Sequence, residues 1–363
     1  MLLKTYDLII VGAGPSGVSA AFFSKLYDKE NEYNILLIEK LKENNYEVYH
    51  DMCGCCVSHS MFKEIRPIKP EFVVENIRFM EEYVADDFAI KHHIRGYILN
   101  RPAFLRNIVE KFISMGGKYL NATISEISHN KGNSSIKIKL NDGNVLETKF
   151  LIAADGANSR IRKQMGLNGI KTSVAIQYLT DEKPEKGTIK FYYDEKYGGN
   201  YKWHFPYGNL SKIGYLFPVN EKETMHGKII KKQARVIACG RLEKYNFGNI
   251  LFVGDAAGQT NILSKGGIRA GMYAGKLAAK STIIYNDPDW YDKKWKKTGF
   301  YLSITPTTKA FERLEKMTNK ELINHLQIFR RGSFFSTLLS FTRKYRKYRD
   351  LYKAYYLEQK YGW

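Results

Sequence analysis

The start of the chain contains two short apolar runs separated by a longer stretch of small and apolar residues. Residues 6–27 open with the apolar run "LIIV", pass three closely spaced glycines and continue as small and apolar residues; "YNILLIEK" at 33–40 is a second apolar run. Short apolar runs bounded by turn residues are typical of buried strands, whereas the longer stretch between them suits a helix. The pattern therefore predicts a strand–helix–strand unit at the beginning of the chain.

The middle of the chain favours strands. Residues 72–99 and 172–219 are strand-rich, and residues 121–153 alternate in character around the turn signals "NKGNSS" and "NDGN". Between them, 101–117 has the spacing of an amphipathic helix and ends in two glycines. Two further glycine turns, "ADGANSRIR" and "GDAAG", follow apolar runs and precede helical patterns. We therefore expect an α/β protein in which helices and strand-rich blocks alternate.

The composition is that of a folded globular protein. Of 363 residues, 44% are hydrophobic and 26% are charged, and the formal net charge is +20. That charge predicts attraction to nucleic acid, phosphate-bearing small molecules or anionic lipid headgroups. No apolar run approaches the roughly 18 residues of a membrane-spanning helix, so membrane contact is expected only from the surface. The four cysteines do not form a disulfide framework, and we expect a reduced, cytoplasmic protein.

The glycines after the first apolar run have the spacing of a dinucleotide-binding turn. Gly12, Gly14 and Gly17 occupy the G-x-G-x-x-G positions. The first glycine makes the tight turn, the second lets a pyrophosphate approach the backbone, and the third lets helix and strand pack closely. Glu39 ends the second apolar run, where it can accept hydrogen bonds from a ribose hydroxyl. A bound dinucleotide is predicted; the alternative is a glycine turn without a ligand.

The stretch 50–59, "HDMCGCCVSH", allows several interpretations. Cys53 and Cys56 form a C-x-x-C pair with His50 and His59 nearby, but the chain has no second such pair, so we predict no metal site. The same cysteines could be a thioredoxin-type redox pair. A buried turn with incidental thiols is the third interpretation. The fourth is a loop whose glycine lets the backbone approach a cofactor.

Three glycine motifs together resemble a known group of proteins. "GAGPSG", "ADGANSRIR" and "GDAAG" occur in the order and spacing of flavoproteins with the p-hydroxybenzoate-hydroxylase type of fold. The resemblance implies that the dinucleotide is FAD. It also implies that Asp155 lies near the dinucleotide and that Asp255 contacts the ribityl chain. The helix that follows, from Gly267 onward, would point its N-terminus at the flavin.

Two further motifs narrow this resemblance. "MCGCCVS" resembles the C-G-x-x-V-S loop of the geranylgeranyl reductase family, and "YKWHFPYG" resembles that family's Y-x-W-x-F-P signature. The resemblance places Cys53 and Gly54 beside the flavin and the aromatic signature on the sheet that covers it. Ser264 and Lys265 stand where the family pattern has proline and a smaller residue.

The motifs and the resemblance together imply a set of site residues. Arg101 would pair with the FAD pyrophosphate, the alternative being a surface arginine, and Ile124 would touch the adenine through its backbone. Cys53 is the hypothesised proton donor, or a neighbour of the flavin ring. The predicted cofactor-binding residues are Gly12, Gly14, Ser16, Gly17, Glu39, Cys53, Gly54, Cys56, Arg101, Ile124, Asp155, Gly254, Asp255, Gly267 and Ile268. The predicted substrate-binding residues are Tyr201, Trp203 and Phe205, which alternate along one strand face.

The resemblance also implies a reaction. The chain is expected to reduce carbon–carbon double bonds in a geranylgeranyl or other polyprenyl chain, carried on a lipid or a diphosphate. Reduced flavin would supply a hydride and the protein a proton, with NAD(P)H or ferredoxin as the electron donor. A flavin-dependent monooxygenase or halogenase of the same fold is the first alternative. The second is a flavoprotein that binds RNA or membrane through its basic end; nucleic acid is the less favoured partner, and a peripheral membrane location is expected.

The expected domains are interleaved. Residues 1–171 and 240–285 form a Rossmann-like βαβ FAD-binding domain with a strand-rich insertion at about 72–99. Residues 172–239 form an antiparallel substrate-binding sheet, and residues 286–363 form a basic, aromatic helical region.

The helical region has an unusual composition. From residue 290 onward, 17 Lys and Arg stand against 6 Asp and Glu, and Tyr345, Tyr348, Tyr352 and Tyr355 recur at helical spacing. One interpretation is an amphipathic helix at the lipid headgroups. A second is RNA binding through stacking and charge. The third is a helix packed on the protein with a solvated basic face.

Overall fold

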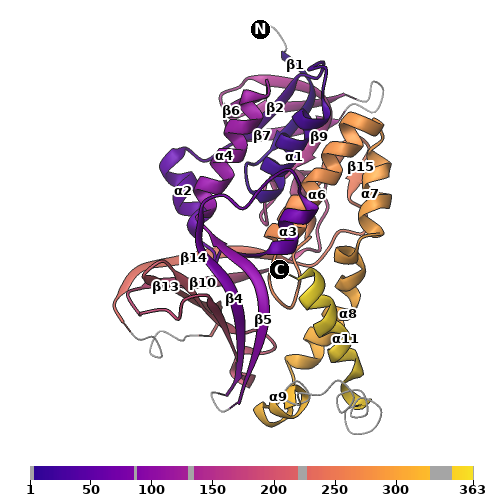
Figure 1. Ribbon diagram of the computed structural model, residues 1–363. Coiled ribbons are helices and arrows are strands. Elements are labelled where there is room, and N and C mark those ends of the chain that lie inside the picture. Colours follow the sequence, from indigo (N-terminus) through magenta and orange to yellow (C-terminus); the bar gives the residue numbers. More distant parts are fainter. Residues whose placement is uncertain (1–3, 86–87, 130–134, 220–226, 328–345, 363) are drawn as a thin grey trace.

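The computed structural model describes residues 4–85, 88–129, 135–219, 227–327 and 346–362. They form two sheets with helices around them, the first sheet at the top of Figure 1 and the second below it. The first sheet contains β1 (Lys4–Val11), β2 (Ile35–Glu39), β6 (Lys118–Asn121), β7 (Ile124–His129), β8 (Ile136–Leu140), β9 (Val145–Ala153), β15 (Asn246–Phe247) and β16 (Ile250–Phe252). The second contains β3 (Cys56–Ser58), β4 (Val73–Val84), β5 (Phe88–Leu99), β10 (Lys171–Thr180), β11 (Thr188–Tyr193), β12 (Lys202–Tyr207), β13 (Leu210–Leu216) and β14 (Ile229–Cys239).

The helices lie mainly at the two ends of the chain. They are α1 (Pro15–Tyr27), α2 (Glu43–Asp51), α3 (His59–Glu64), α4 (Arg101–Ser114), α5 (Arg160–Gln164), α6 (Ile268–Lys280), α7 (Pro288–Lys296), α8 (Gly299–Leu314), α9 (Asn319–Leu326) and α11 (Arg349–Tyr361). Short helical turns are η1 (Glu195–Tyr197), η3 (Gly254–Ala257), η4 (Ser281–Tyr285) and η6 (Arg346–Tyr348). No helix in the described part of the chain is both long and apolar enough to cross a membrane.

The first sheet is built around a parallel core. Its order is β15-β16-β9-β1-β2-β6, and β8 joins it through β9. β1 pairs in parallel with both β2 and β9. Residues 8–11 and all of β2 are buried, as expected for strands covered on both faces. The predicted strand–helix–strand unit is confirmed, with α1 between β1 and β2.

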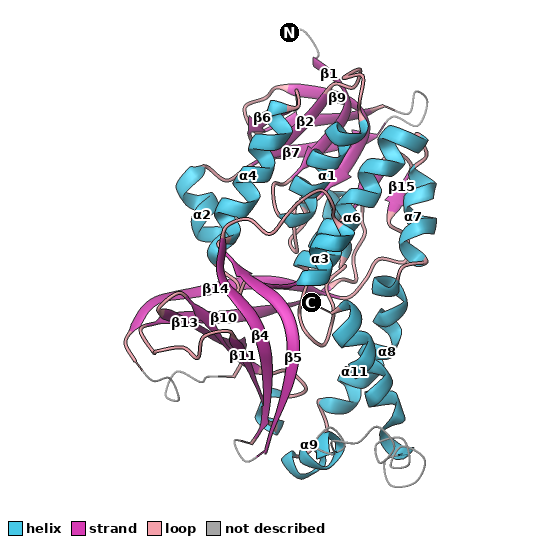
Figure 2. Ribbon diagram, viewed as in Figure 1, coloured by secondary structure: helices cyan, strands magenta, loops and turns pink. Residues whose placement is uncertain are grey.

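Helices α1, α4 and α6 gather over one face of this sheet (Figure 2). α1 and α6 approach so closely that a side-chain carbon on Gly275 of α6 would collide with the carbonyl oxygen of Ser16. At the start of α1, a carbon on Gly17 would likewise collide with the carbonyl oxygen of Gly12. Residues without a side chain therefore set the distance between the glycine turn and both helices.

The second sheet contains the strand-rich segment 72–99. Its order is β14-β10-β13-β12-β11-β4-β5-β3, and β4 pairs in parallel with β11. The strand-rich segment 72–99 was expected as an insertion in the FAD-binding domain, but its strands extend the sheet of 172–239 instead. Which sheet edge a strand joins depends on long-range pairing, which local composition does not encode. The "NDGN" turn joins β8 to β9 as predicted, whereas most of "NKGNSS" lies outside the described residues.

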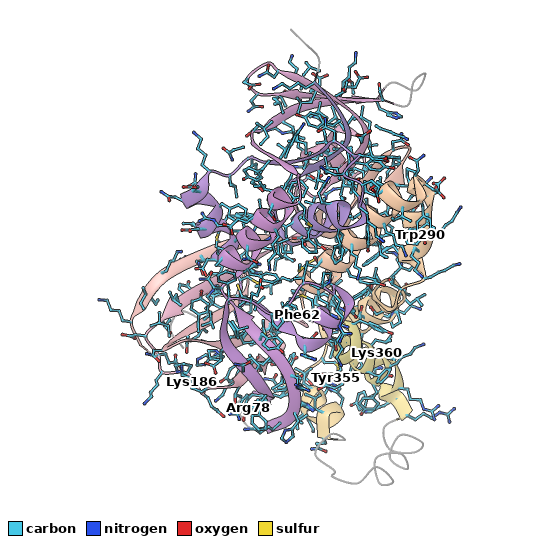
Figure 3. All side chains as sticks on the ribbon, turned by 45° about the horizontal axis from the view of Figure 1, so that its top comes forward. Phe62, Arg78, Lys186, Trp290, Tyr355 and Lys360 are labelled. Atoms are coloured by element: carbon cyan, nitrogen blue, oxygen red, sulfur yellow. The ribbon has the colours of Figure 1, made fainter. Side chains whose placement is uncertain are left out.

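The last helix runs back into the molecule. The C-terminus lies near the centre of Figure 1, beside α3, and Tyr355 lies between α11 and the β4–β5 pair, where its hydroxyl contacts Glu82 (Figure 3). Tyr348 and Tyr352 are buried, which matches the interpretation of a packed helix; Tyr345 lies outside the described residues. The basic residues at the start of this segment are exposed: Arg346, Lys347 and Arg349.

Gly275→Ala should destabilise the fold. The added carbon would meet backbone atoms of α1 that cannot rotate away, so we expect the free energy of unfolding to fall by about 1–3 kcal/mol, as for overpacked cores. Gly271→Ala in the same helix is the matched control, because its added carbon would meet the Ser16 side chain at an ordinary 3.5 Å. Denaturant unfolding of both variants checks this, and equal stabilities would contradict it.

Candidate functional site

A long cavity of about 490 Å³ lies between the two sheets. It runs from the glycine turn after β1 to an apolar end at Leu314, Leu322 and Leu326 of α8 and α9. Its volume is within the usual range for small-molecule sites. Every residue predicted to contact cofactor or substrate lines this cavity except Gly17, which packs against Gly12. The fold therefore brings together residues that are more than two hundred positions apart.

The glycine turn leaves room for a phosphate. Gly12 has a φ of +101°, a value that strongly favours glycine. A side-chain carbon on Gly14 would be in ordinary van der Waals contact with the His50 ring, at 3.6 Å, so its absence leaves the backbone there accessible from the cavity. α1 begins just after this turn without a side-chain cap. Its first N–H groups are therefore available to an anion in the cavity.

Glu39 closes the same turn from the end of β2. Its buried carboxylate accepts hydrogen bonds from the backbone N–H of Ala13, at 2.6 Å, and of Leu41, at 2.8 Å. The Tyr46 hydroxyl donates to the carbonyl of Ala13 at 2.7 Å. These bonds fix the carboxylate at the cavity wall, at the position where the motif places a ribose contact.

Arg101 enters the cavity from the first turn of α4. Its Nε donates to the carbonyl of His50 at 2.6 Å, while Nη2 is buried and has no partner in the protein. A buried guanidinium nitrogen without an acceptor is costly. The interpretation as a surface arginine is therefore wrong, and the group is available to an anionic ligand.

The Asp-Gly turn after β9 also contains a buried polar atom without a hydrogen-bond partner. Oδ2 of Asp155 accepts from the N–H groups of Arg160 and Ile161 and so caps α5, while its Oδ1 is buried without a partner. Burial raises the pKa of the Asp155 carboxyl. Arg160 donates to the carbonyl of Ile124 at 2.7 Å, so the strand predicted to meet the adenine is tied to this turn.

The second Gly-Asp turn and the start of α6 form the opposite wall. The carboxylate of Asp255 accepts from the Thr260 hydroxyl at 2.8 Å, and the Gly254 N–H donates to Gln259 at 2.6 Å. α6 begins after Gly267 without a side-chain cap. Its N-terminal N–H groups and the positive end of its dipole therefore face the cavity.

The cysteine turn lies where the two sheets meet. Lys212 of β13, fully buried, holds it from behind: its Nζ lies 2.8 Å from Oδ1 of Asp51 and 3.2 Å from the carbonyl of Cys53. A side-chain carbon on Gly54 would come within 2.6 Å of the Phe205 ring. Gly54 is thus needed for contact with the second sheet; the resemblance had suggested room for the cofactor.

The pKa values of the thiols in this turn are shifted in opposite directions. The pKa of Cys53 lies well below its usual value because Cys55 hydrogen-bonds with it, its backbone N–H donating to the Cys53 sulfur, and because the positive charges of Arg101 and Arg235 favour the charged form. The pKa of Cys55 lies well above its usual value because of its contact with Cys53, assisted by burial. Burial likewise raises the pKa of Cys56. Among the described residues no three metal-ligating side chains cluster, so the zinc interpretation gains no support.

The aromatic signature forms the wall of the second sheet. Tyr201, Trp203 and Phe205 are all buried on one face, as their alternation predicts. Trp203 lies directly over Gly214, its partner in β13, where a side-chain carbon would collide with the indole. Phe191 of β11 packs edge-to-face against Tyr201 and Phe205. This part of the cavity is apolar and rigid.

One residue of the site was missed from the sequence. Glu358 of α11 lines the cavity, and both of its carboxylate oxygens are buried beside Ser264 and Asn261. Burial raises the pKa of this carboxyl from 4.5 to about 7. Tyr201 donates to the carbonyl of Ser264, so α11 and the aromatic wall meet at the same loop. A lone glutamate in a basic helix carries no motif that could have identified it.

The chain is similar in sequence to one family model and to named reductases. Residues 7–177 match the family model described as lycopene cyclase protein. The digeranylgeranylglycerophospholipid reductase of Methanocaldococcus jannaschii is 28% identical over 362 residues, covering 88% of this chain and 90% of that protein.

Solved structures show the same fold. A geranylgeranyl bacteriochlorophyll reductase-like protein from Thermoplasma acidophilum superposes with a TM-score of 0.81 at 21% identity, covering 98% of this chain and 100% of that one. A flavin-dependent brominase, solved as a triple mutant, superposes with a TM-score of 0.69 at 15% identity over 96% and 99% of the two chains. The predicted α/β flavoprotein fold is confirmed.

Glu358→Gln should remove a pH dependence of stability. The folded protein keeps a proton that the unfolded chain releases between pH 4.5 and about 7. The stabilisation by this group is complete below pH 4.5 and is lost as the pH rises through about 7. The size is about 3 kcal/mol. Denaturant unfolding across this pH range checks it, with exposed Asp350→Asn of the same helix as control; an unchanged slope in Glu358→Gln would refute it.

Proposed function

We propose that this chain, a relative of the digeranylgeranylglycerophospholipid reductases, is an oxidoreductase that uses FAD to saturate carbon–carbon double bonds in a polyprenyl chain. The observation that carries the proposal is the single cavity that joins a dinucleotide cradle to an aromatic and apolar chamber. A prenyl chain attached to a lipid or a diphosphate suits such a chamber. Reduced FAD supplies the hydride for this reaction.

The residues of the first sheet fit FAD. The missing side chain at Gly14 and the unpartnered Nη2 of Arg101 suit a pyrophosphate. The carboxylates of Glu39 and Asp255 are hydrogen-bond acceptors at positions that suit the ribose and the ribityl hydroxyls. The uncapped N-terminus of α6 suits the electron-rich edge of a flavin.

The remaining wall fits an apolar chain. Trp203, Phe205 and Phe191 form a rigid face, and the cavity continues past Ile189 to Leu322 at its far end. Burying each methylene of a prenyl chain there contributes about 0.8 kcal/mol. An apolar chamber also excludes water, which would otherwise capture a cationic intermediate of the alkene.

Proton delivery is assigned to Glu358 in this proposal. An isolated alkene accepts hydride only when a proton reaches its other carbon, so the site needs an acid. Cys53 was the hypothesised donor, but Cys55, Arg101 and Arg235 lower the pKa of its thiol and so favour its charged form. Glu358, with a pKa of about 7, is present in substantial part as the neutral acid at neutral pH and can donate a proton. A negative charge on Cys53 would stabilise the cationic character that protonation of the alkene creates.

The proposal also covers where the substrate comes from, which donor reduces the flavin and which activity is the main rival. Exposed Arg346, Lys347 and Arg349 at the start of the last helix suit anionic headgroups, so the substrate would be taken from a membrane surface. NAD(P)H and ferredoxin both remain candidate electron donors. A monooxygenase or halogenase is the rival function, since the brominase has the same fold.

Anaerobic turnover of the purified protein tests the function. Dithionite-reduced enzyme is mixed with geranylgeranyl diphosphate or a geranylgeranylated glycerophospholipid, and products are weighed by mass spectrometry. We expect flavin reoxidation together with a gain of two hydrogens per double bond. Reoxidation only after air is admitted, with oxygen in the product, would establish the rival. The same assay on Glu358→Gln should show kcat lowered by roughly 100-fold or more, the usual loss of a general acid.

Arg101→Ala should weaken FAD binding. The guanidinium is buried and has one nitrogen without a partner, and a charged hydrogen bond of this kind is worth roughly 10- to 100-fold in affinity. Arg106→Ala on the same helix is the control, because Arg106 is half-exposed and paired with Glu47. Fluorescence titration of the apoprotein with FAD measures both, with circular dichroism to confirm folding. Equal affinities would remove Arg101 from the site.

A further inference from the structure

Two thiols face each other across Gly54 in the cysteine turn. The backbone N–H of Cys55 donates to Sγ of Cys53 at 3.3 Å, and Sγ of Cys55 donates to the carbonyl of Cys53 at 3.2 Å. Both sulfurs are therefore folded back onto the same three-residue turn. Neither has a disulfide partner, and Cys53 is half-buried at the cavity wall while Cys55 is buried.

The geometry of the turn suits a bond between these two sulfurs. Cα atoms two residues apart lie within about 7 Å of each other, close to the span of a disulfide. Cys55 has a φ of +57°, a tight-turn conformation that is uncommon for a residue with a side chain. Lys212 holds the turn in place through the carbonyls of Asp51 and Cys53.

Cys56 is excluded from this arrangement by its backbone. It begins β3 and pairs with Ile98 of β5, and the carbonyl of Cys55 accepts from the Leu99 N–H at 3.1 Å. The chain is thus extended and fixed in the sheet from Cys56 onward. The hydrogen bonds of the turn therefore link Cys53 with Cys55, while the backbone of Cys56 belongs to the sheet.

The charges around the turn prepare one sulfur as a nucleophile. Arg101 of α4 and Arg235 of β14 each have a buried guanidinium nitrogen without a partner, and both attract the Cys53 thiolate. The nearest carboxylate, Asp51, is already bound by Lys212 and Gln233. A thiol whose charged form is favoured, beside a thiol whose neutral form is favoured, is the arrangement of an attacking and a resolving cysteine.

We propose that Cys53 and Cys55 form a peroxide-reactive dithiol that closes reversibly into an intramolecular disulfide. The Cys53 thiolate attacks hydrogen peroxide, forming an S–O bond as the O–O bond breaks and hydroxide leaves. Cys55 then loses its proton to hydroxide and attacks Sγ of Cys53, forming the S–S bond and releasing a second hydroxide. Two electrons pass from the thiols to the peroxide, and a dithiol reductant reverses the change.

The bond would change the site electrostatically. Closure removes the thiolate charge that compensates Arg101 and Arg235, so turnover should stop until the disulfide is reduced. This consequence rests on the proposed function, whereas the disulfide itself does not. Flavin enzymes handled in air generate peroxide, so the oxidant can arise in the same cavity.

Thiol mapping tests the proposal without any turnover. The purified holoprotein is treated with stoichiometric hydrogen peroxide, denatured, alkylated with N-ethylmaleimide and digested with trypsin. The peptide of residues 43–63 should be two hydrogens lighter and carry a single label, on Cys56. Dithiothreitol before alkylation should restore three labels. Labels on all three cysteines after peroxide, or a bond from Cys53 to Cys56, would overturn the proposal.

Variants assign the roles of the two sulfurs. Cys55→Ser should leave a sulfenic acid on Cys53, trapped by dimedone, and form no disulfide, whereas Cys56→Ser should still form it. Cys239, buried on β14 beside Ser173, is the matched control thiol. Cys53 should react with peroxide at least about tenfold faster than Cys239; equal rates, or a disulfide that survives Cys55→Ser, would contradict the assignment.

Discussion

A single buried ammonium group, that of Lys212, determines the shape of the site. It is fully buried on β13, 2.8 Å from Oδ1 of Asp51 and 3.9 Å from the centre of the Tyr207 ring. Removing a charge from water is tolerable only when partners compensate it fully, and breaking such a pair typically costs about 3–5 kcal/mol. Asp51 and the cysteine turn that follows it therefore cannot leave the second sheet. The ion pair fixes the boundary between the two halves of the cavity.

This boundary divides the cavity into two chambers of different chemistry. On one side, backbone N–H groups, uncapped helix N-termini and Arg101 create a polar cradle for an anion. On the other, Trp203 and Phe205 form an apolar wall. The cysteine turn stands at their junction, where Arg101 and Arg235 favour a thiolate.

The C-terminal helix completes the second chamber. Tyr352 is buried and Tyr355 contacts Glu82 of β4. The residue that follows the helix, Gly362, docks on the loop before α6, because its carbonyl accepts a hydrogen bond from the Ser264 hydroxyl. Glu358 is carried into the cavity wall by this docking. Its raised pKa is a direct consequence, because a carboxylate enclosed away from water is disfavoured relative to the neutral acid.

The sequence by itself determined the features that local patterns encode. The spacing of Gly12, Gly14 and Gly17 predicted the turn after the first strand, and the alternation of Tyr201, Trp203 and Phe205 predicted a common face. Such features depend on the backbone period and on glycine conformations, which a short stretch carries within itself. Residue roles inferred by resemblance came with those motifs, and the fold brings nearly all of them to one cavity.

Only the tertiary structure decided which distant groups meet. The placement of β4 and β5 in the second sheet, the burial of Lys212 against Asp51 and the entry of Glu358 into the cavity wall all depend on contacts between residues far apart in the chain. Packing and charge compensation select these contacts from many that the sequence permits. The chemistry of the site depends on these contacts, because the lowered pKa of Cys53 and the raised pKa of Glu358 result from surroundings that no short motif contains.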